Sequence, residues 1–592
     1  MASYKAPLKE MQFVLDEVIH LEQRLEGIDR FAELSPDLVR GVVEEAAKVI
    51  EGTVAPLNAS GDEQGCRYND GDVHTPDGFP EAWQTFVDGG WPGLSQSEDY
   101  GGQGLPFVLS QVLMEMMAGA NSSFSLYPLL TAGACEALEA HGSKALCDAY
   151  LPHLATGEWT GTMCLTEPQA GSDLALVKTR AEPADDGKYR INGSKIFITG
   201  GEHDLAPNIV HLVLARLPDA PAGIRGISMF LVPKYLPDAE GQPGQRNGVR
   251  CANIEKKMGI HAASTCVLNF DAAEGYLVGK EHQGIQNMFT MMNMARLGVG
   301  NQGLGIAEAA TQNAITYACE RNQGRPLSRK GEAATDTVPI VEHPDVRRML
   351  FTMKALTEAG RVLAYEAAAS VDIARHHPDA DERERAQDFV DLMTPVCKAS
   401  LTDAGCDLAA LGVQVFGGHG FIREHGMEQF VRDARINTLY EGTNGIQAMD
   451  LVARKLKLHD GRLVERYFDD IGGFCKTHAG NKELAFIIEP LGETLKAMIE
   501  VTAHVRDALS SAPDDAGAAA YDYLRALSLL AMGYAWARMA LAVAGTDNAF
   551  ARTKLATARF FAQRLLPQIH GLVPSIRAGA ESLMAVSADD LS

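Results

Sequence analysis

Apolar residues follow a helical period over the first quarter of the chain. Between residues 35 and 54 they recur every three or four positions behind Ser35-Pro36, a dipeptide that suits the first turn of a helix. Helical patterning continues, with loops, to about Glu158. We therefore expect an N-terminal helical domain over residues 1–158.

The pattern changes to short apolar or alternating runs after residue 159. These runs, separated by Gly, Pro and Asp, are residues 189–199, 209–214, 227–232 and 267–270. Within the first of them, Asn192-Gly193 is the dipeptide typical of a tight hairpin turn. The pattern predicts an antiparallel β domain over residues 159–278.

Helical periodicity returns in stretches long enough for the antiparallel helices of a four-helix bundle. The stretches are residues 284–321, 343–376 and 381–413, and the polar segment 322–342 links the first two. They place a C-terminal bundle domain over residues 279–455. Residues 518–544, rich in Ala, Leu and Met, predict an additional helical domain over residues 456–592. The expected fold class is a multi-domain α+β protein.

Composition and charge exclude several classes of protein. The 592 residues are 46% hydrophobic and 22% charged, which is ordinary for a globular protein, and 53 basic against 77 acidic residues give a net charge of −24. This charge disfavours nucleic acid. The first twenty residues mix charged with apolar positions, and no apolar run is long enough to span a bilayer, so we expect a cytoplasmic protein without a membrane segment. Ten cysteines without C-x-x-C spacing argue against zinc and disulfides and favour buried free thiols.

Two motifs match known ligand sites but lie in the wrong context. Gly298 to Gly303 spell G-x-G-x-x-G, the spacing of dinucleotide-binding turns, but the flanking pattern is helical rather than strand-turn-helix. Close packing of helices explains these glycines better. His376-His377 and the acidic residues after them read as a solvated loop between helices rather than a metal site. We expect no metal.

Three other segments have patterns that suit a functional site. Residues 163–173 form a strand that ends in a small-residue turn, residues 413–421 close a long helix with a cluster of glycines, and Glu441 follows an apolar patch before Gly442. An apolar environment raises the pKa of a carboxylate, as a general base for a weak carbon acid requires. A polar turn, a helix cap and a carboxylate at a helix N-terminus remain the alternative interpretations of the three.

Taken together and in this order, the segments resemble the acyl-CoA dehydrogenase family of flavoproteins over roughly residues 40–455. The motifs that carry the resemblance are Cys164-Leu165-Thr166-Glu167-Pro168, Ala170-Gly171-Ser172-Asp173, Lys195-Ile196-Phe197-Ile198-Thr199, Met258-Gly259-Ile260-His261, Gln414-Val415-Phe416-Gly417-Gly418, Arg432-Asp433 and Tyr440-Glu441-Gly442-Thr443. The N-terminal extension and the added tail are similar to a longer bacterial branch, which includes enzymes acting on 3-(methylthio)propionyl-CoA.

The resemblance implies FAD as the cofactor. The implied cofactor-binding residues are Met163, Leu165, Thr166, Gly171, Ser172, Phe197, Ile198, Thr199, Arg321, Gln414, Gly418 and Thr443. Phe197 stands where many relatives carry Trp. In the family, Arg321 and the turn from Gln414 to Gly418 would reach the FAD of a neighbouring subunit, so the resemblance also implies an oligomer. We expect a homodimer, in which the C-terminal helices cover a surface that shorter relatives use to form tetramers.

The resemblance also implies the chemistry. Glu441 aligns with the catalytic base, which removes the α-proton of an acyl-CoA thioester as the β-hydride passes to flavin N5. Residue 295 is Ala, so the base position used by some relatives holds no carboxylate. The implied substrate-binding residues are Ser172, Asn293, Arg296 and Gly442.

The expected activity is therefore that of an FAD-dependent acyl-CoA dehydrogenase. It would form trans-2-enoyl-CoA in fatty-acid β-oxidation, with straight-chain substrates and an electron-transferring flavoprotein as the electron acceptor. The alternatives are a 3-(methylthio)propionyl-CoA dehydrogenase, an acyl-CoA oxidase and, from another class, a non-catalytic acyl-CoA-binding scaffold.

Overall fold

Contacts within the chain divide it into two compact units. The computed structural model describes residues 3–329 and 337–592, so part of the polar segment 322–342 lies outside the described residues. One unit, Val42–Gly298, is called the sheet unit here, and the other, Met1–Gly41 with Val299–Ser592, is called the bundle unit. Each is described by itself.

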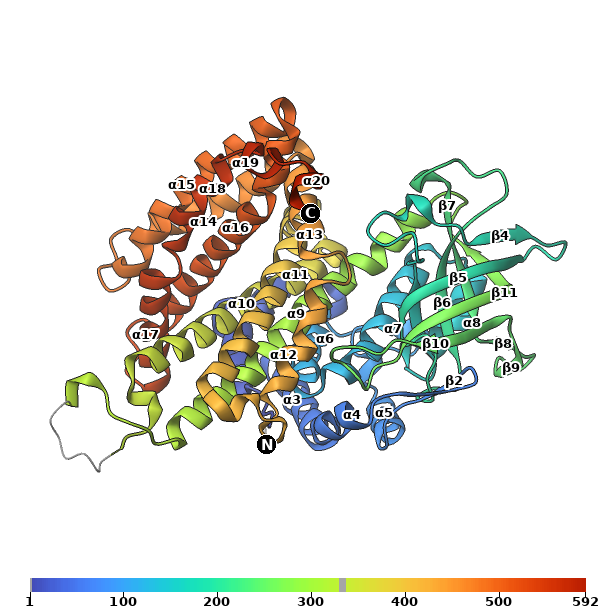
Figure 1. The fold of residues 1–592 in the computed structure, drawn as a ribbon, viewed down its shortest axis with the longest axis horizontal. Coiled ribbons are helices and arrows are strands. Elements are labelled where there is room, and N and C mark those ends of the chain that lie inside the picture. The colour runs from blue at the N-terminus through green and yellow to red at the C-terminus, as the bar shows by residue number, and fades with distance from the viewer. Residues whose placement is uncertain (1–2, 330–336) are drawn as a thin grey trace. The chain divides into compact units, whose positions relative to one another are not determined.

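The sheet unit contains a seven-stranded sheet (Figure 1). The strands are β3 (Thr160–Cys164), β4 (Arg180–Pro183), β5 (Tyr189–Thr199), β6 (Ile209–Arg216), β7 (Ile227–Pro233), β10 (Val249–Ile254) and β11 (Thr265–Val278). Their order is β10-β11-β5-β4-β6-β3, and β7 pairs with both β11 and β6. The sheet is mainly antiparallel, as the sequence predicts, but β6 pairs in parallel with β3 and with β4.

The predicted hairpin at Asn192-Gly193 is wrong, because β5 runs straight through this dipeptide. The register of the neighbouring strand β11 shifts between Phe270 and Ala273, and the side chain of Asn192 accepts a hydrogen bond from the backbone N–H of Ala272 at 2.8 Å. A Cβ added to Gly193 would lie 2.9 Å from the Cα of Thr179. The dipeptide therefore serves a β-bulge and a close approach of backbones, not a turn.

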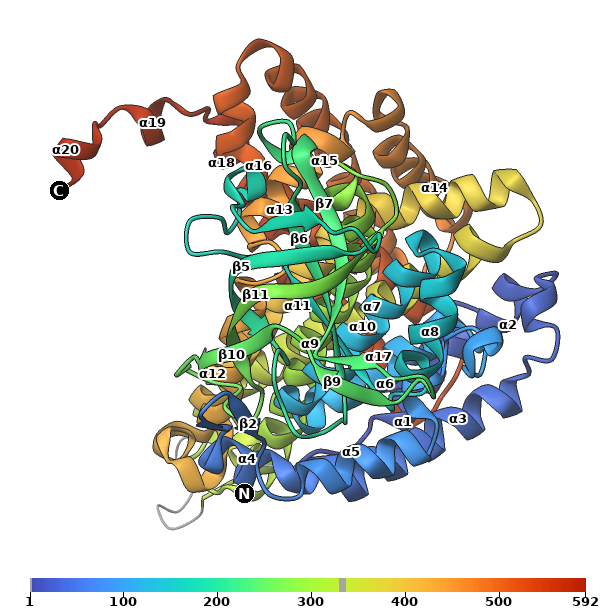
Figure 2. The same cartoon turned by 90° about the vertical axis from the view of Figure 1, so that its right-hand side faces the viewer.

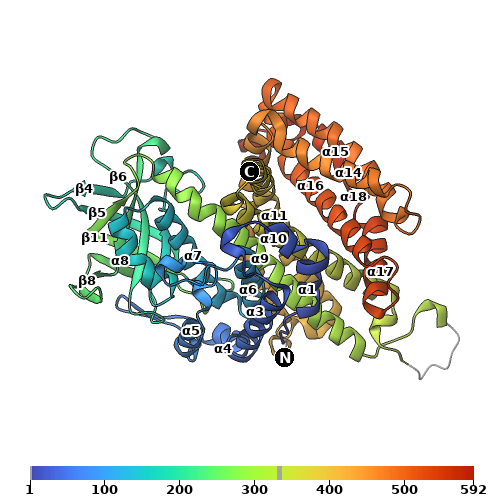
Figure 3. The ribbon, with the colours of Figure 1, turned by 180° about the vertical axis from the view of Figure 1, so that it is seen from behind.

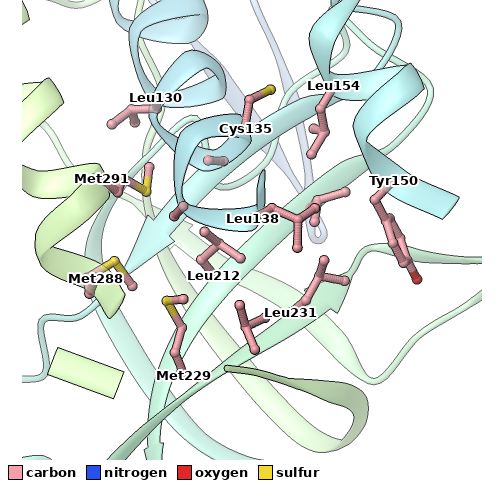
Figure 4. Close-up of a cluster of buried hydrophobic side chains, with 14 of the residues drawn as sticks. Leu130, Cys135, Leu138, Tyr150, Leu154, Leu212, Met229, Leu231, Met288 and Met291 are labelled. Carbon is pink, nitrogen blue, oxygen red and sulfur yellow. The ribbon is translucent and has the colours of Figure 1, made fainter. Parts of the chain in front are cut away.

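Helices before and after the sheet complete the sheet unit. They are α3 (Pro36–Val49, whose first residues belong to the bundle unit), α4 (Asn58–Gln64), α5 (Phe79–Asp88), α6 (Phe107–Ala120), α7 (Ser122–His141), α8 (Lys144–Ala155) and the first part of α9 (Gly284–Glu320). A short two-stranded ribbon, β1 (Arg67–Asn69) with β2 (Asp72–His74), interrupts the predicted helical region. Side chains from α7, α8, α9 and the sheet form one buried apolar cluster, which includes Leu138, Leu212 and Met291 (Figure 4).

Three long helices of the predicted bundle are confirmed. The second part of α9 lies in the bundle unit with α10 (Pro344–His376), α11 (Ala380–Phe416), α12 (Met427–Arg435) and α13 (Asn444–Asp450). The G-x-G-x-x-G motif is part of helix α9, as the sequence predicts. A Cβ added to Gly405 of α11 would lie 2.8 Å from the carbonyl oxygen of Gly303. The glycine therefore permits close packing of two helix backbones.

The tail adds five longer helices to the bundle unit. They are α14 (Arg462–His478), α15 (Ala485–Ser511), α16 (Pro513–Ala542), α17 (Ala549–Arg564) and α18 (Gln568–Arg577), and the short helices α19 (Glu581–Met584) and α20 (Ala588–Leu591) extend beyond them (Figure 2). The N-terminal extension, with α1 (Leu8–Phe13) and α2 (Leu21–Leu25), packs on α10 and α16 (Figure 3). Buried Lys554 of α17 joins Glu10 of α1 to Glu358 of α10.

The described residues also bear on the other expectations from composition. All ten cysteines are described and free, and six are buried, but Cys319 is exposed. Within residues 3–329 and 337–592, no three His, Cys, Asp or Glu side chains are grouped so that they could hold a metal ion. None of the described helices is both long and apolar enough to cross a membrane.

Candidate active site

The end of strand β3 presents the first group of predicted site residues, all in the sheet unit. Cys164 is fully buried in the apolar core on one side of the sheet, whereas Met163 and Leu165 are half-buried against the cluster on the other side. Thr166 is also half-buried, and its carbonyl accepts a hydrogen bond from the N–H of Ile196 at 2.9 Å. This hydrogen bond joins the end of β3 to β5, the strand that carries the second group of predicted site residues, Phe197, Ile198 and Thr199.

A buried ion pair holds these two groups together. Lys195 Nζ donates to Oε1 of Glu167 and to the carbonyl oxygen of Leu165, each at 2.9 Å. Glu167 also accepts from the hydroxyl of Thr179 at 2.6 Å and from the N–H of Lys178 at 2.7 Å. Burial raises the pKa of Glu167, but the charge of Lys195 and these hydrogen bonds outweigh it and lower the pKa to about 2. Glu167 is therefore ionised, and it fixes the turn that follows β3.

The turn after β3 leaves Gly171 and Ser172 exposed. A Cβ added to Gly171 would meet no atom within 4 Å, and the carboxylate of Asp173 accepts a hydrogen bond from the N–H of Ala175 at 2.9 Å. The backbone of Gly171 and the hydroxyl of Ser172 are therefore open to a ligand.

The end of strand β5 contains an exposed aromatic residue. Phe197 is 59% exposed and has a left-handed backbone with a φ of 58°, which is unusual for an aromatic residue. Ile198 points the other way and is buried in the sheet core, so only its backbone is available to a ligand. Thr199 is half-buried and pairs with Thr265 of β11. The exposed ring of Phe197 fits a flavin ring, and the open backbone of Gly171 and the exposed hydroxyl of Ser172 fit its pyrophosphate.

Asn293 and Arg296 lie one helical turn apart on the first part of α9. Arg296 is buried, its Nη1 lies 3.5 Å from Oδ1 of Asn293, and its guanidinium lies 5.8 Å from the ring centre of Phe289. Ala295 between them is buried as well. The structure therefore brings the two predicted substrate-binding residues of this helix together.

The remaining predicted site residues lie in the bundle unit. Glu441 follows the short helix Ile436–Thr438 and precedes α13. Its φ is 57°, and that of Gly442 is 82°, so two successive residues adopt the left-handed conformation. Thr443 caps α13, since its hydroxyl accepts from the N–H of Ile446 at 3.2 Å. A left-handed backbone at a non-glycine residue costs free energy and is typical of a site that needs one particular geometry.

Tyr440 and Gln447 anchor this loop on both sides of Glu441. The Tyr440 hydroxyl donates a hydrogen bond to Oε1 of Gln302 on α9. Burial and the charge of Glu441 raise the pKa of Tyr440 well above its usual value, so the phenol stays neutral. The Gln447 side chain donates to the carbonyl of Glu441 at 3.0 Å. No sequence pattern indicates the roles of Gln302 and Gln447, which depend on contacts that only the folded chain creates.

The ends of α9 and α11 bring together the last predicted cofactor-binding residues. Gln414 and Gly418 are exposed at the end of α11, and a Cβ added to Gly418 would meet no atom within 4 Å. Arg321 follows the end of α9, where Tyr317 stacks on Phe416 with ring centres 4.1 Å apart. The contact of these residues with FAD of a neighbouring subunit stays a prediction.

Comparisons with known proteins decide the family. Four domain models match: acyl-CoA dehydrogenase N-terminal domain over residues 40–158, middle domain over 162–273, C-terminal domain over 282–456, and a model described as acetyl-CoA dehydrogenase C-terminal like over 467–587. A 3-methylmercaptopropionyl-CoA dehydrogenase from Ruegeria pomeroyi is 43% identical over 596 residues, which cover 99% of this chain and 100% of that protein. The chain belongs to the acyl-CoA dehydrogenase family. It is thus an oxidoreductase of a flavin-dependent family.

Two further proteins show that the likeness extends over almost the whole chain. A butyryl-CoA dehydrogenase from Syntrophomonas wolfei is 33% identical over 605 residues, which cover 98% of both chains. The structure of an acyl-CoA dehydrogenase from Bacillus anthracis complexed with FAD superposes with a TM-score of 0.75, covering 95% of this chain and 90% of that one. At 23% identity, this match shows the shared fold alone.

Proposed function

We propose that this acyl-CoA dehydrogenase binds FAD and converts a saturated acyl-CoA into a trans-2-enoyl-CoA, with Glu441 as the base. The observation that carries the proposal is the Glu441 loop, where a carboxylate stands on a strained backbone that part-buried hydrogen bonds of Tyr440 and Gln447 anchor on both sides. Backbone strain of this kind is more typical of a reacting group than of a surface carboxylate.

The chemistry required of Glu441 is demanding. The α-proton of a thioester is a weak acid, so a carboxylate can remove it only where the thioester oxygen is stabilised as negative charge develops. Backbone N–H groups held in one orientation supply such stabilisation at no cost of reorganisation, and we assign this role to the N–H of Glu441. FAD, when bound, accepts the hydride that leaves the β-carbon. Met163, Leu165, Thr166 and Phe197 would hold the flavin ring.

We further propose that the acyl group is short, with 3-(methylthio)propionyl and butyryl as the leading candidates. The sheet unit contains a cavity of about 50 Å³, whose lining includes Met114, Met117, Gly133 and Met294. A volume of this order admits only a few water-sized groups. A Cβ at Gly133 would lie 2.9 Å from Cγ of Met291, so little room remains on that side. If this cavity receives the end of the acyl chain, long chains are excluded, and the 43% identical relative from Ruegeria pomeroyi carries a name that fits this size.

Replacement of Glu441 tests the base. In E441Q the yellow flavin should remain bound, but its absorbance near 450 nm should no longer be lost on anaerobic mixing with butyryl-CoA or 3-(methylthio)propionyl-CoA. Bleaching of E441Q as fast as that of the parent enzyme would exclude Glu441 as the base. A purified protein without flavin absorbance and unable to take up FAD would instead support the non-catalytic acyl-CoA-binding alternative.

The electron acceptor separates a dehydrogenase from an oxidase. We propose an electron-transferring flavoprotein as the acceptor, a homodimer as the assembly and β-oxidation in the cytoplasm as the setting, all on the family resemblance. Hydrogen peroxide formed in amounts equal to the acyl-CoA consumed in air would favour the oxidase alternative.

A further inference from the structure

The buried side chain of Gln447 on α13 donates hydrogen bonds to the carbonyl oxygens of two successive peptide units. Its Nε2 donates to the carbonyl oxygen of Glu441 at 3.0 Å and to that of Gly442 at 3.4 Å. The two acceptors fix the orientation of the amide, because an amide oxygen in the same place would meet two carbonyl oxygens. Gln447 itself has no exposed surface.

The two carbonyls belong to the part of the loop whose backbone is left-handed. Glu441 has a φ of 57°, a conformation that costs a non-glycine residue roughly 1–2 kcal/mol. Because each peptide unit is planar and trans, fixing the carbonyls of Glu441 and Gly442 also fixes the N–H directions of the residues that follow. The Gln447 amide therefore fixes the backbone on the C-terminal side of Glu441, the residue that carries the carboxylate.

The helix that carries Gln447 is itself fixed to the bundle. Asn444, in the first turn of α13, accepts a hydrogen bond from Lys398 Nζ at 2.8 Å and donates to the hydroxyl of Thr402 at 3.0 Å and to Asp403 at 2.7 Å. Lys398 and Thr402 are fully buried on α11. The hydrogen bond from Gln447 to Glu441 therefore comes from a helix that is fixed to α11, not from a flexible loop.

The oxygen of the Gln447 amide differs from its donor end. Its Oε1 is buried and has no hydrogen-bond partner among the described residues. Among the described residues, all hydrogen bonds of this side chain are therefore made by its donor end, Nε2.

We propose that Gln447 is a positioning residue for the base: its amide holds Glu441 in the conformation from which the carboxylate removes the α-proton. This inference rests on the proposed function, since it takes Glu441 as the base. It separates two roles within one loop, with Glu441 as the group that reacts and Gln447 as the group that sets its backbone.

The test compares two replacements in the full-length holoenzyme. Q447M keeps the volume but removes the donor, whereas Q447E keeps the shape but turns an oxygen toward two carbonyls. Flavin bleaching by butyryl-CoA and by 3-(methylthio)propionyl-CoA is followed anaerobically over a range of substrate concentrations. For Q447M we expect the limiting rate to fall on the order of 10²-fold, because small misplacements of a catalytic group have effects of that size. The substrate concentration at half-maximal rate, the flavin content and the thermal midpoint should stay close to those of the parent.

The thermal midpoint and the flavin content distinguish positioning from packing. A packing role predicts that Q447M lowers the thermal midpoint and the flavin content together with the limiting rate, whereas positioning predicts that the limiting rate falls while the midpoint and the flavin content stay close to those of the parent. Q568M is the matched control, because Gln568 is exposed at the start of α18 and its amide donates to the carbonyl oxygen of Arg564 at the end of α17, far from the Glu441 loop in the sequence. It should behave as the parent.

The outcomes separate this inference from the proposed function. A Q447M enzyme as fast as the parent, with E441Q inactive, would overturn the positioning role and leave the base in place. A Q447M enzyme whose limiting rate falls only together with its thermal midpoint and flavin content would also overturn it. E441Q as fast as the parent would overturn the proposed function, whatever Gln447 does.

Discussion

The ammonium of Lys195 lies 2.9 Å from Oε1 of Glu167, and the two side chains are 0% and 3% exposed. Lys195 stands on β5 two residues before Phe197, and Glu167 directly follows Thr166. One buried ion pair thus links the two segments that we expect to hold the flavin ring. The spacing of these segments depends on it, because Lys195 also bonds the carbonyl of Leu165.

Removing one partner of this pair should be costly. K195M would leave the Glu167 carboxylate buried without its counter-charge, a change that typically costs about 3–5 kcal/mol of unfolding free energy. The double variant K195M/E167Q removes both charges and should recover part of the loss. Thermal unfolding and flavin content measured side by side provide the check, with K48M on an exposed surface pair as the matched control. Equal midpoints for K195M and K48M would show that the buried pair contributes nothing.

His211 should make the stability of the sheet unit depend on pH. This residue of β6 is buried, and its Nδ1 is 2.7 Å from the hydroxyl of Thr162. Burial, with smaller effects from Lys234 and His203, lowers the pKa of His211 to about 3. The unfolded chain would bind a proton near the usual value of about 6.5, so unfolding gains a proton in the window between these values. Stability should therefore be full above pH 6.5 and fall as the pH drops toward 3, by up to about 1.4 kcal/mol per pH unit for this residue.

The measurement is the unfolding midpoint of the enzyme between pH 7.5 and pH 4.5. H211N should be less stable than the parent at pH 7.5 but show a shallower loss on acidification. H20N, which changes a histidine outside the sheet unit that is exposed, provides the reference slope. A parent-like slope for H211N would mean that His211 is already protonated in the folded protein.

The sequence predicted the helices of this fold better than its strand pairing. The expected helices at 343–376 and 381–413 correspond to α10 and α11, because their periodicity is a local property. The parallel pairing of β3 with β6 joins residues about fifty positions apart, and no local pattern contains it. The Asn192-Gly193 error has the same cause, since the bulge that the dipeptide serves lies in β11.

The candidate site also contains some residues that local motifs indicate and others that depend on long-range contacts. Glu441 and the residues around Phe197 were found from motifs, whereas Gln447, Gln302 and the Lys195–Glu167 pair act through contacts that only the folded chain creates. The contact of Ile198 with the flavin stays a prediction that concerns its backbone, since its side chain lies in the core, because successive residues of a strand point to opposite faces. The division of the chain into four domains stays a prediction.

Gly303 should tolerate no side chain. A Cβ at this position of α9 would collide with the carbonyl oxygen of Leu401 on α11, and overpacking of this kind typically costs about 1–3 kcal/mol. G303A should therefore lower the thermal midpoint. G492A is the matched control, since Gly492 lies inside helix α15 with no atom within 4 Å of an added Cβ. It should raise stability by about 0.5–1 kcal/mol through helix propensity alone, and a gain for both variants would contradict the close packing of α9 on α11.

Enlarging the small cavity of the sheet unit should change the preferred acyl chain. Met114 lines this cavity and is buried, so M114A adds room for about three heavy atoms. The parent should prefer butyryl-CoA and 3-(methylthio)propionyl-CoA to octanoyl-CoA, and M114A should raise kcat/KM for octanoyl-CoA relative to butyryl-CoA on the order of tenfold, since each buried methylene is worth about 0.8 kcal/mol. Dye-linked assays with the three thioesters give the ratio, and M584A, at an exposed methionine near the C-terminus, is the control. An unchanged ratio in M114A would show that this cavity does not receive the acyl chain, and a parent enzyme that already prefers octanoyl-CoA would contradict the short-chain assignment itself.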